Sequence, residues 1–196
     1  MKKAIIGAGG FAREVYHHMI NDGYNNISFF VDDKYATSDV FPLSMFDPFE
    51  YEVVVAVGDP KVKKLIIDNL PADTNFFTFI HSSALILDKS IKIGKGSIIC
   101  ANCILTTNIV LGDHVHLNLA TTIGHDVNIG DYFTSAPGVH ISGNCDIGTQ
   151  VYFGTNSSIK QKLSVCDDVT IGMHGGVVKS IKTPGTYIGC PATIIQ

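Results

Sequence analysis

The chain has no tryptophan, and charged side chains make up only 16% of its 196 residues. Its net charge of -4 argues against a broad basic surface, so we expect no nucleic-acid partner. No apolar run approaches the roughly 18 to 20 residues that a membrane-spanning helix needs, so we expect no membrane insertion. The apolar run after Lys2 and Lys3 breaks on glycine and is too short for the core of a signal peptide. These absences predict a cytoplasmic protein.

Cysteine occurs five times, an odd number without the spacing of a disulfide framework. Cys100 and Cys103 form a single C-x-x-C, and no second pair accompanies it. Ordinary buried thiols are therefore a simpler interpretation than a metal or redox site. We expect no disulfide and no metal ion.

The first 80 residues alternate between apolar strands and helical segments. Strands are expected at "KKAII", "NISFFVDD", "EVVVAVGDP" and "NFFTFI". Helices are expected at "FAREVYHHMINDG" and "PKVKKLIIDNL", the second with proline in its first turn. This alternation predicts right-handed βαβ units and a small parallel sheet. Residues 1–80 are therefore predicted to form a Rossmann-like half-domain.

A glycine-rich loop, "GAGGFA", joins the first strand to the first helix. Gly7 to Ala12 fit G-x-G-x-x-G/A, in which glycines let the backbone approach a diphosphate at the helix N-terminus. Asp32 and Asp33 close the second strand, where an acid would meet ribose hydroxyls. Because about 80 residues supply only half of a dinucleotide-binding fold, a nucleotide-sugar fits better than NAD. The alternative is that the glycines serve only a tight turn.

From about Leu87 onward the sequence follows a period of six. Apolar side chains, all aliphatic except Phe153, recur at every sixth position from Leu87 to Val177 without an insertion, and only Ser135 interrupts the series. An α-helix has 3.6 residues per turn and cannot keep this period, whereas a coil with three six-residue faces can. We predict a parallel β-helix over residues 81–196. Glycine often follows the aliphatic residue, and we expect it to supply unusual backbone dihedrals at the corners.

Three hexads make one coil, so residues 18 apart should lie about 4.8 Å apart in neighbouring coils. His125 falls at a corner two positions after Ile123, and Gly143 stacks on it. Asp126 follows His125 at once, and Asn118 lies in the preceding hexad. A histidine can act as a general base near neutral pH, and a neighbouring carboxylate can orient its ring. A solvated corner histidine is the alternative.

The whole chain resembles the bacterial sugar acyltransferases of the NeuD/PglD type. The resemblance rests on "GAGGFARE", followed in order by "GHDVNIGDY", "APGVHISGN", "GTNSSI" and "IGCPA". It implies a left-handed β-helix and a homotrimer with active sites between neighbouring β-helices. It also implies acetyl-CoA as the donor and a nucleotide-linked 4-amino-4,6-dideoxy sugar as the acceptor. In some members the acceptor is a sugar hydroxyl.

The resemblance also assigns the residues of the site. It implies that His125 is the catalytic base, with Asp126 as its acidic partner and Asn118 as a further polar group. The positions expected to bind the nucleotide-sugar are Gly9, Gly10, Phe11, Asp32, Asp33 and Gly58. The positions expected to contact acetyl-CoA are Thr134, Gly143, Thr155, Gly172 and Met173. At Thr134 the family commonly has a second histidine, and threonine cannot carry a proton charge there.

We therefore predict an acetyl-CoA-dependent N-acetyltransferase that acts on the 4-amino group of the nucleotide-linked sugar. Transfer would be direct, with His125 as the base and no acyl-enzyme. One alternative is a sugar O-acetyltransferase with a sialic acid-like acceptor, and another is a non-catalytic nucleotide-sugar-binding protein. A third is a γ-type carbonic anhydrase, in which His114, His116 and His140 would hold zinc.

Overall fold

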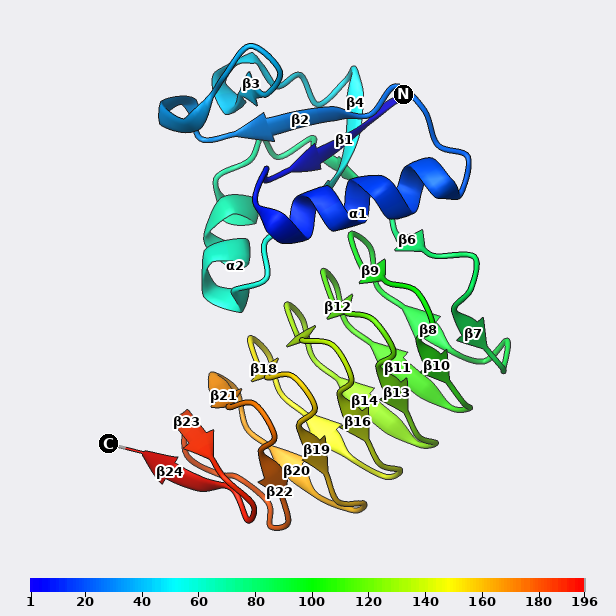
Figure 1. Ribbon diagram of the computed structural model, residues 1–196, viewed down its shortest axis with the longest axis vertical. Coiled ribbons are helices and arrows are strands. Elements are labelled where there is room, and N and C mark those ends of the chain that lie inside the picture. Colours follow the sequence, from blue (N-terminus) through cyan, green and yellow to red (C-terminus); the bar gives the residue numbers. More distant parts are fainter. Residues whose placement is uncertain (196) are drawn as a thin grey trace.

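The computed structural model describes residues 1–195, which form an α/β part stacked on a parallel β-helix (Figure 1). The α/β part contains one parallel sheet in the order β3-β2-β1-β4-β5. Its elements are β1 (Lys2–Ile6), α1 (Gly10–Asn21), β2 (Ser28–Val31), β3 (Phe41–Pro42), β4 (Tyr51–Val55), α2 (Pro60–Asp68) and β5 (Asn75–Phe76), with short 3-10 turns at Asp33–Tyr35 and Leu43–Met45. Within residues 1–195, no helix is long and apolar enough to cross a membrane.

Side chains of β1 alternate between the two faces of this sheet. Ile5 packs with α1 residues on the face toward the β-helix, and Ile6 packs on the other face against α2. Asp59 caps α2 by accepting hydrogen bonds from two backbone N–H groups, and Pro60 follows at the first helical position. The predicted βαβ alternation is thus confirmed, although β3 was not predicted.

The β-helix has three flat sheets, which we call sheets I, II and III. Sheet I contains β6 (Phe79–Ile80), β9 (Ile98–Ile99), β12 (His116–Leu117), β15 (Thr134–Ser135), β18 (Tyr152–Phe153), β21 (Val169–Ile171), β23 (Gly185–Ile188) and β24 (Thr193–Ile195). Sheet II contains β7 (Leu85–Ile86), β10 (Ile104–Leu105), β13 (Thr122–Ile123), β16 (His140–Ile141), β19 (Ser158–Ile159) and β22 (Gly176–Val177). Sheet III contains β8 (Lys92–Ile93), β11 (Ile109–Leu111), β14 (Val127–Ile129), β17 (Asp146–Ile147) and β20 (Ser164–Val165). The predicted class, a left-handed parallel β-helix after a Rossmann-like half-domain, is confirmed.

The aliphatic series begins one residue earlier than the period suggested. Leu105 pairs with Ile86, and Leu87 is 64% exposed. The next strands, β8 and β11, pair with the regular spacing of 18 residues. One extra residue therefore lies in the turn between β7 and β8, where Asp88 accepts a hydrogen bond from the Ser90 N–H. The expectation of an uninterrupted register is wrong at this turn.

The glycines that follow the aliphatic residues are needed for close packing rather than for unusual dihedrals. Left-handed backbone at the corners belongs to other residues, such as Asn108, Asp126 and Asn144, with φ between 51° and 58°. A Cβ on Gly130 would lie 2.8 Å from the carbonyl carbon of Gly148 in the next coil. The expectation about corner dihedrals is thus wrong, because coil stacking itself excludes a side chain.

The segment at residues 75–80, predicted as one strand, is divided between the two parts. β5 joins the sheet of the α/β part, whereas β6 pairs with β9 in sheet I. The break falls at Phe77 and Thr78, and the Thr78 hydroxyl donates to the Gly94 carbonyl of the β-helix. The connection between the two parts is therefore short and bonded to both.

The α/β part rests on sheet I and buries its outer surface (Figure 1). His116 and Thr134 point outward from this sheet, yet they are only 1% and 4% exposed. Lys63 of α2 is fully buried, and its Nζ donates to Thr134 Oγ1 at 2.9 Å and to the Phe133 carbonyl at 3.2 Å. Burial lowers the pKa of Lys63 and of His116 well below their ordinary values. The two parts therefore share a desolvated, polar interface.

The close stacking of coils predicts a stability defect from one added methyl group. Gly130→Ala should cost about 1–3 kcal/mol, since its Cβ meets backbone that cannot move aside. Thermal unfolding should show a melting temperature lower by roughly 2–4 °C per kcal/mol. Gly58→Ala is the matched control, because a Cβ there meets nothing within 4 Å. Equal melting temperatures for the two variants would contradict this account of the glycines.

Candidate active site

His125 occupies the corner between β13 of sheet II and β14 of sheet III. Its side chain is 57% exposed, so the ring is open to solvent at the surface. The Nδ1 atom lies 2.7 Å from Asp126 Oδ2. The arrangement expected from the sequence, a corner histidine held by the acid that follows it, is therefore present.

The hydrogen bonds of Asp126 determine which ring nitrogen is available. Asn108 Nδ2 donates to the other carboxylate oxygen at 2.6 Å. This bond, together with the one from His125, lowers the pKa of the Asp126 carboxyl and keeps it ionised. An ionised carboxylate can only accept, so Nδ1 of His125 is the protonated nitrogen. The Nε2 atom is left with a lone pair that can take a proton.

Gly143 stacks directly on His125, as the 18-residue spacing predicted. A Cβ at position 143 would lie 2.7 Å from His125 Nε2. Even alanine would therefore push against the nitrogen that is free to act as a base. Glycine here leaves both the ring and its own backbone open to a ligand.

The role of Asn108 was not predicted from the sequence, although the 18-residue spacing between coils could have identified it. It stands 18 residues before Asp126, and both residues adopt left-handed backbone. Asparagine and aspartate are the side chains that tolerate this conformation best. Their stacking therefore gives the carboxylate a fixed donor from the preceding coil.

The other predicted positions on the β-helix lie on different surfaces. Asn118, Thr155, Gly172 and Met173 share the corner between sheets I and II, which we call the Asn118 corner. Asn118 Oδ1 accepts a hydrogen bond from the Leu119 N–H at 2.7 Å. Thr134 lies on sheet I beneath α2, bonded to Lys63. One chain therefore does not bring these positions together with His125.

A cleft of about 910 Å³ opens at the glycine loop of the α/β part. Gly9 and Asp32 line it, together with Lys34 and Tyr35. Gly7 is the glycine that the turn itself requires, since its φ is 115°. A Cβ on Gly9, Gly10 or Gly58 would meet nothing within 4 Å, so packing does not demand glycine there. The open backbone at the start of α1 suits a diphosphate.

Three of the predicted nucleotide contacts, Phe11, Asp32 and Asp33, are engaged within the protein. Asp33 accepts a hydrogen bond from the Ser44 N–H at 3.0 Å, which lowers the pKa of its carboxyl. The Phe11 ring packs against His116, with the ring centroids 5.3 Å apart. Asp32 accepts a hydrogen bond from the Lys34 N–H at 3.2 Å, but it lines the cleft whereas Asp33 does not, so Asp32 is the acid better placed for a ligand.

The histidines proposed as zinc ligands are not gathered in one chain. His114 and His116 lie beneath the α/β part, where burial lowers the pKa of His114 to about 4. His140 lies on sheet II and contacts Thr122. Across residues 1–195, no group of three histidine, cysteine, aspartate or glutamate side chains is arranged to hold a metal ion.

The C-x-x-C pair is divided between two hydrophobic cores. Cys100 packs with α1 residues, whereas Cys103 lies inside the β-helix. Both are free thiols, and burial raises the pKa of Cys103 to about 12. Neither thiol is reactive in this setting, because the thiolate is the reactive form.

Comparison with known proteins identifies relatives of both parts. Residues 2–70 match the PglD N-terminal domain. GDP-perosamine N-acetyltransferase of Escherichia coli O157:H7 is 29% identical over 171 residues, which cover 80% of this chain and 77% of that protein.

The acetyltransferase domain of PglB from Neisseria gonorrhoeae FA1090 is 30% identical, with a TM-score of 0.89 and 99% of each chain covered. The same domain has been solved with acetyl coenzyme A, and that structure has a TM-score of 0.88. The similarity thus extends over the half-domain, the β-helix and their arrangement. The chain belongs to the NeuD/PglD family of bacterial sugar acyltransferases.

Proposed function

We propose that this chain acetylates the 4-amino group of a nucleotide-linked 4-amino-4,6-dideoxy sugar, with acetyl-CoA as the donor. The observation that carries the proposal is the His125 corner, where ionised Asp126 holds Nδ1–H and leaves Nε2 open beside Gly143. The Escherichia coli relative is named as an N-acetyltransferase, which favours an amine over a hydroxyl. The Neisseria structure with acetyl coenzyme A supports this donor.

His125 acts as a general base in a direct transfer. Its Nε2 removes a proton from the sugar amine as the amine nitrogen attacks the thioester carbonyl carbon. The new C–N bond forms, the C–S bond breaks, and the departing CoA sulfur takes the proton from the imidazolium. Base catalysis of this kind contributes typically ~10²–10⁴-fold. The Gly143 N–H is the proposed donor to the developing oxyanion.

A second copy of the chain is needed to complete this site. The glycine loop lies above sheet I, whereas the His125 corner joins sheets II and III on the opposite side. The Asn118 corner, with Thr155 and Met173, is likewise separate from His125. A homotrimer that sets the His125 corner of one chain against the Asn118 corner of the next would unite them. We therefore place the active sites between neighbouring β-helices.

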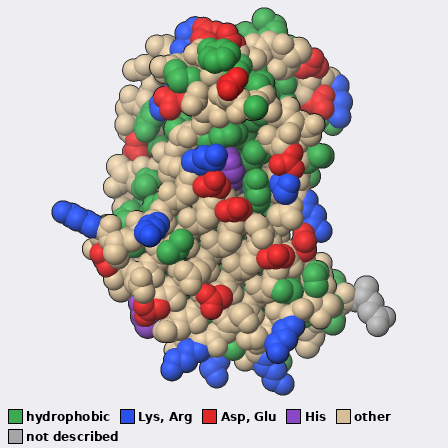
Figure 2. Space-filling model, turned by 180° about the vertical axis from the view of Figure 1, so that it is seen from behind, with side chains coloured by type: hydrophobic (Ala, Val, Ile, Leu, Met, Phe, Trp, Pro, Cys, Tyr) green, Lys and Arg blue, Asp and Glu red, His purple; other side chains and the backbone are tan. Residues whose placement is uncertain are grey.

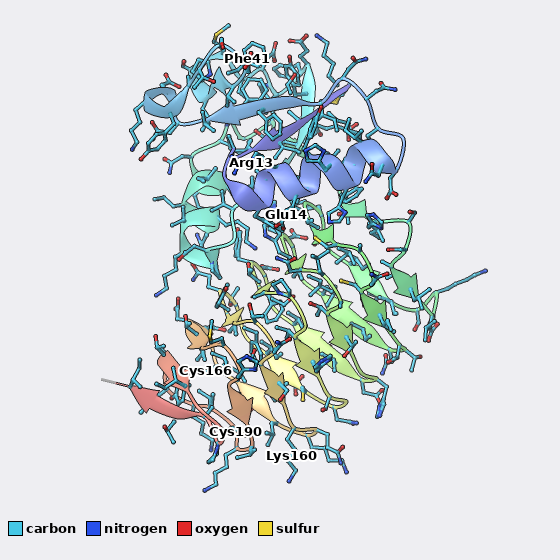
Figure 3. All side chains as sticks on the ribbon, viewed as in Figure 1. Arg13, Glu14, Phe41, Lys160, Cys166 and Cys190 are labelled. Atoms are coloured by element: carbon cyan, nitrogen blue, oxygen red, sulfur yellow. The ribbon has the colours of Figure 1, made fainter. Side chains whose placement is uncertain are left out.

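The corner between sheets II and III that carries His125, which we call the His125 ridge, ends in three exposed lysines, whose positive charge matches the negative charge of coenzyme A. Backbone hydrogen bonds link His125 to Asn144, Gly143 to Lys162, and Lys160 to Val177, so the ridge continues through these coils. Two coils span about 10 Å along the β-helix, and this separates Lys160 and Lys162 from His125. Part of the pantetheine arm of coenzyme A could span that distance. Figure 2 shows basic side chains at the lower end of the molecule, where Figure 3 labels Lys160. The three lysines are Lys160, Lys162 and Lys179.

Loss of the base should abolish most of the turnover. His125→Ala should lower kcat at least ~10²-fold, whereas the chain should keep its fold because the ring is exposed. Asp126→Asn should also lower kcat, and asparagine tolerates the left-handed backbone at that position. Release of free thiol from acetyl-CoA measures both, with a nucleotide-linked 4-amino sugar and its 4-hydroxy counterpart as acceptors. Full activity of His125→Ala, or acetylation of only the hydroxyl sugar, would refute the proposal.

The two adjacent aspartates should differ in their effect on the acceptor. Asp32→Asn should weaken binding of the nucleotide about 10- to 100-fold, since hydrogen bonds to a charged group are worth roughly 1.5–3 kcal/mol. Asp33→Asn is the matched control, because Asp33 does not line the cleft and its carboxylate accepts the Ser44 N–H. Calorimetric titration with GDP, UDP and acetyl-CoA separates the two sites. Equal losses from both variants, or a loss for acetyl-CoA alone, would show that the cleft does not bind the nucleotide.

Removing charge from the lysines of the His125 ridge should weaken the donor and not the acceptor. The double variant Lys160→Gln and Lys179→Gln should raise KM for acetyl-CoA about 2- to 30-fold, since exposed ion pairs contribute about 0.2–1 kcal/mol each. High salt should reduce the difference from the wild type by screening. Lys89→Gln and Lys92→Gln, near the start of the β-helix, form the control pair. A rise in the acceptor KM instead would place the donor on another surface.

A further inference from the structure

Ser135 is the one polar residue in the inward aliphatic series, and its hydroxyl is fully buried. Thr121, also fully buried, points into the same core from the preceding coil. The two hydroxyl oxygens lie 2.8 Å apart. Two hydroxyls are thus desolvated in an otherwise apolar core, a cost that their hydrogen bonds must offset.

These two hydroxyls bind the backbone of Asn118 from both sides. The Asn118 N–H donates to Ser135 Oγ at 3.1 Å, and Thr121 Oγ1 donates to the Asn118 carbonyl at 2.8 Å. If Ser135 donates to Thr121, each hydroxyl gives one proton and accepts one, and the ring of three bonds closes. Every polar group in the ring is then satisfied.

The bonding at Asn118 differs from that at the matching position of other coils. There the corner N–H donates to a backbone carbonyl of the next coil, as from Cys100 to Leu117, Ala136 to Phe153 and Gly154 to Ile171. At Asn118 the side chain of Ser135 takes the place of that carbonyl. The Asn118 N–H therefore depends on the Ser135 side chain, whereas the Asn118 carbonyl also accepts hydrogen bonds from the Thr121 N–H at 3.2 Å and from Cys103 Sγ at 3.1 Å.

We infer that Ser135 and Thr121 are positioning residues that hold Asn118 in place for catalysis. The inference rests on the proposed function, in which Asn118 belongs to the active site. Asn118 Oδ1 accepts a hydrogen bond from the Leu119 N–H, which leaves the two amide N–H donors for a substrate. Neither hydroxyl needs to touch substrate, because both lie inside the coil.

The structural part of the inference can be tested without any substrate. Ser135→Ala and Thr121→Val remove the hydroxyls, and valine already occupies the position that stacks on Thr121, at Val139. Hydrogen exchange of the Asn118 amide should become at least about 3-fold faster in Ser135→Ala, the scale set by one lost hydrogen bond. Ser157→Ala is the matched control, since its buried hydroxyl has no hydrogen-bond partner within the described chain. Unchanged exchange at Asn118 in Ser135→Ala would overturn the inference.

The catalytic part is tested by a double-mutant cycle. Ser135→Ala and Thr121→Val should each lower kcat about 3- to 10-fold, with little change in either KM, while Thr121→Ser should retain the wild-type kcat. In an Asn118→Ala background, Ser135→Ala should cause no further loss. An additive loss, or a full kcat for Asn118→Ala, would overturn the positioning role. Failure of the proposed function is distinct, because it appears as undiminished activity of His125→Ala.

Discussion

Parallel hydrogen bonding between successive coils, repeated every 18 residues, is the interaction on which the rest of this structure depends. Backbone N–H groups along the β-helix donate to carbonyls of the neighbouring coil, as from Gly112 to Ile129 and from Gly130 to Ile147. The bonds hold the coils so close that a Cβ at Gly124 or Gly130 would meet backbone of the next coil. Because of these bonds, residues that are 18 apart in the sequence lie above one another in neighbouring coils. Asn108 thereby reaches the Asp126 carboxylate, and Gly143 covers the His125 ring.

The triangular coil gives each of its surfaces a different environment. Sheet I is covered by the α/β part, which buries His116 and Thr134 around the amine of Lys63. The corner between sheets II and III is left open, and there His125 is half exposed and held by an ionised carboxylate. Two buried histidines with depressed pKa values, His114 and His116, and an exposed, oriented histidine, His125, therefore occur in one short segment of the chain. Burial and hydrogen bonding, rather than residue type, separate a structural histidine from a candidate base.

Several features of the candidate site were predictable because they follow from spacing alone. The His125–Asp126 contact joins sequence neighbours, and Gly143 lies one coil beyond His125. Other expectations were wrong where local chemistry overrides the period. Asp88 organises a turn with one extra residue, so the aliphatic series starts at Ile86 rather than Leu87. The glycines were explained by dihedrals, although the approach of the next coil is what requires them.

The sequence by itself determined the parallel coil, the alternating half-domain and the corner that carries His125, since each depends on a short-range period that repeated hydrogen bonding enforces. Only the tertiary structure decided how those surfaces are used. It placed Thr134 beneath Lys63, separated Asp32 in the cleft from Asp33 in its turn, and set Asn118 on a hydroxyl pair formed by Ser135 and Thr121. These contacts join residues with no common period, or side chains whose partners depend on how the two parts dock. Their geometry arises from packing in three dimensions, which a pattern along the chain does not encode.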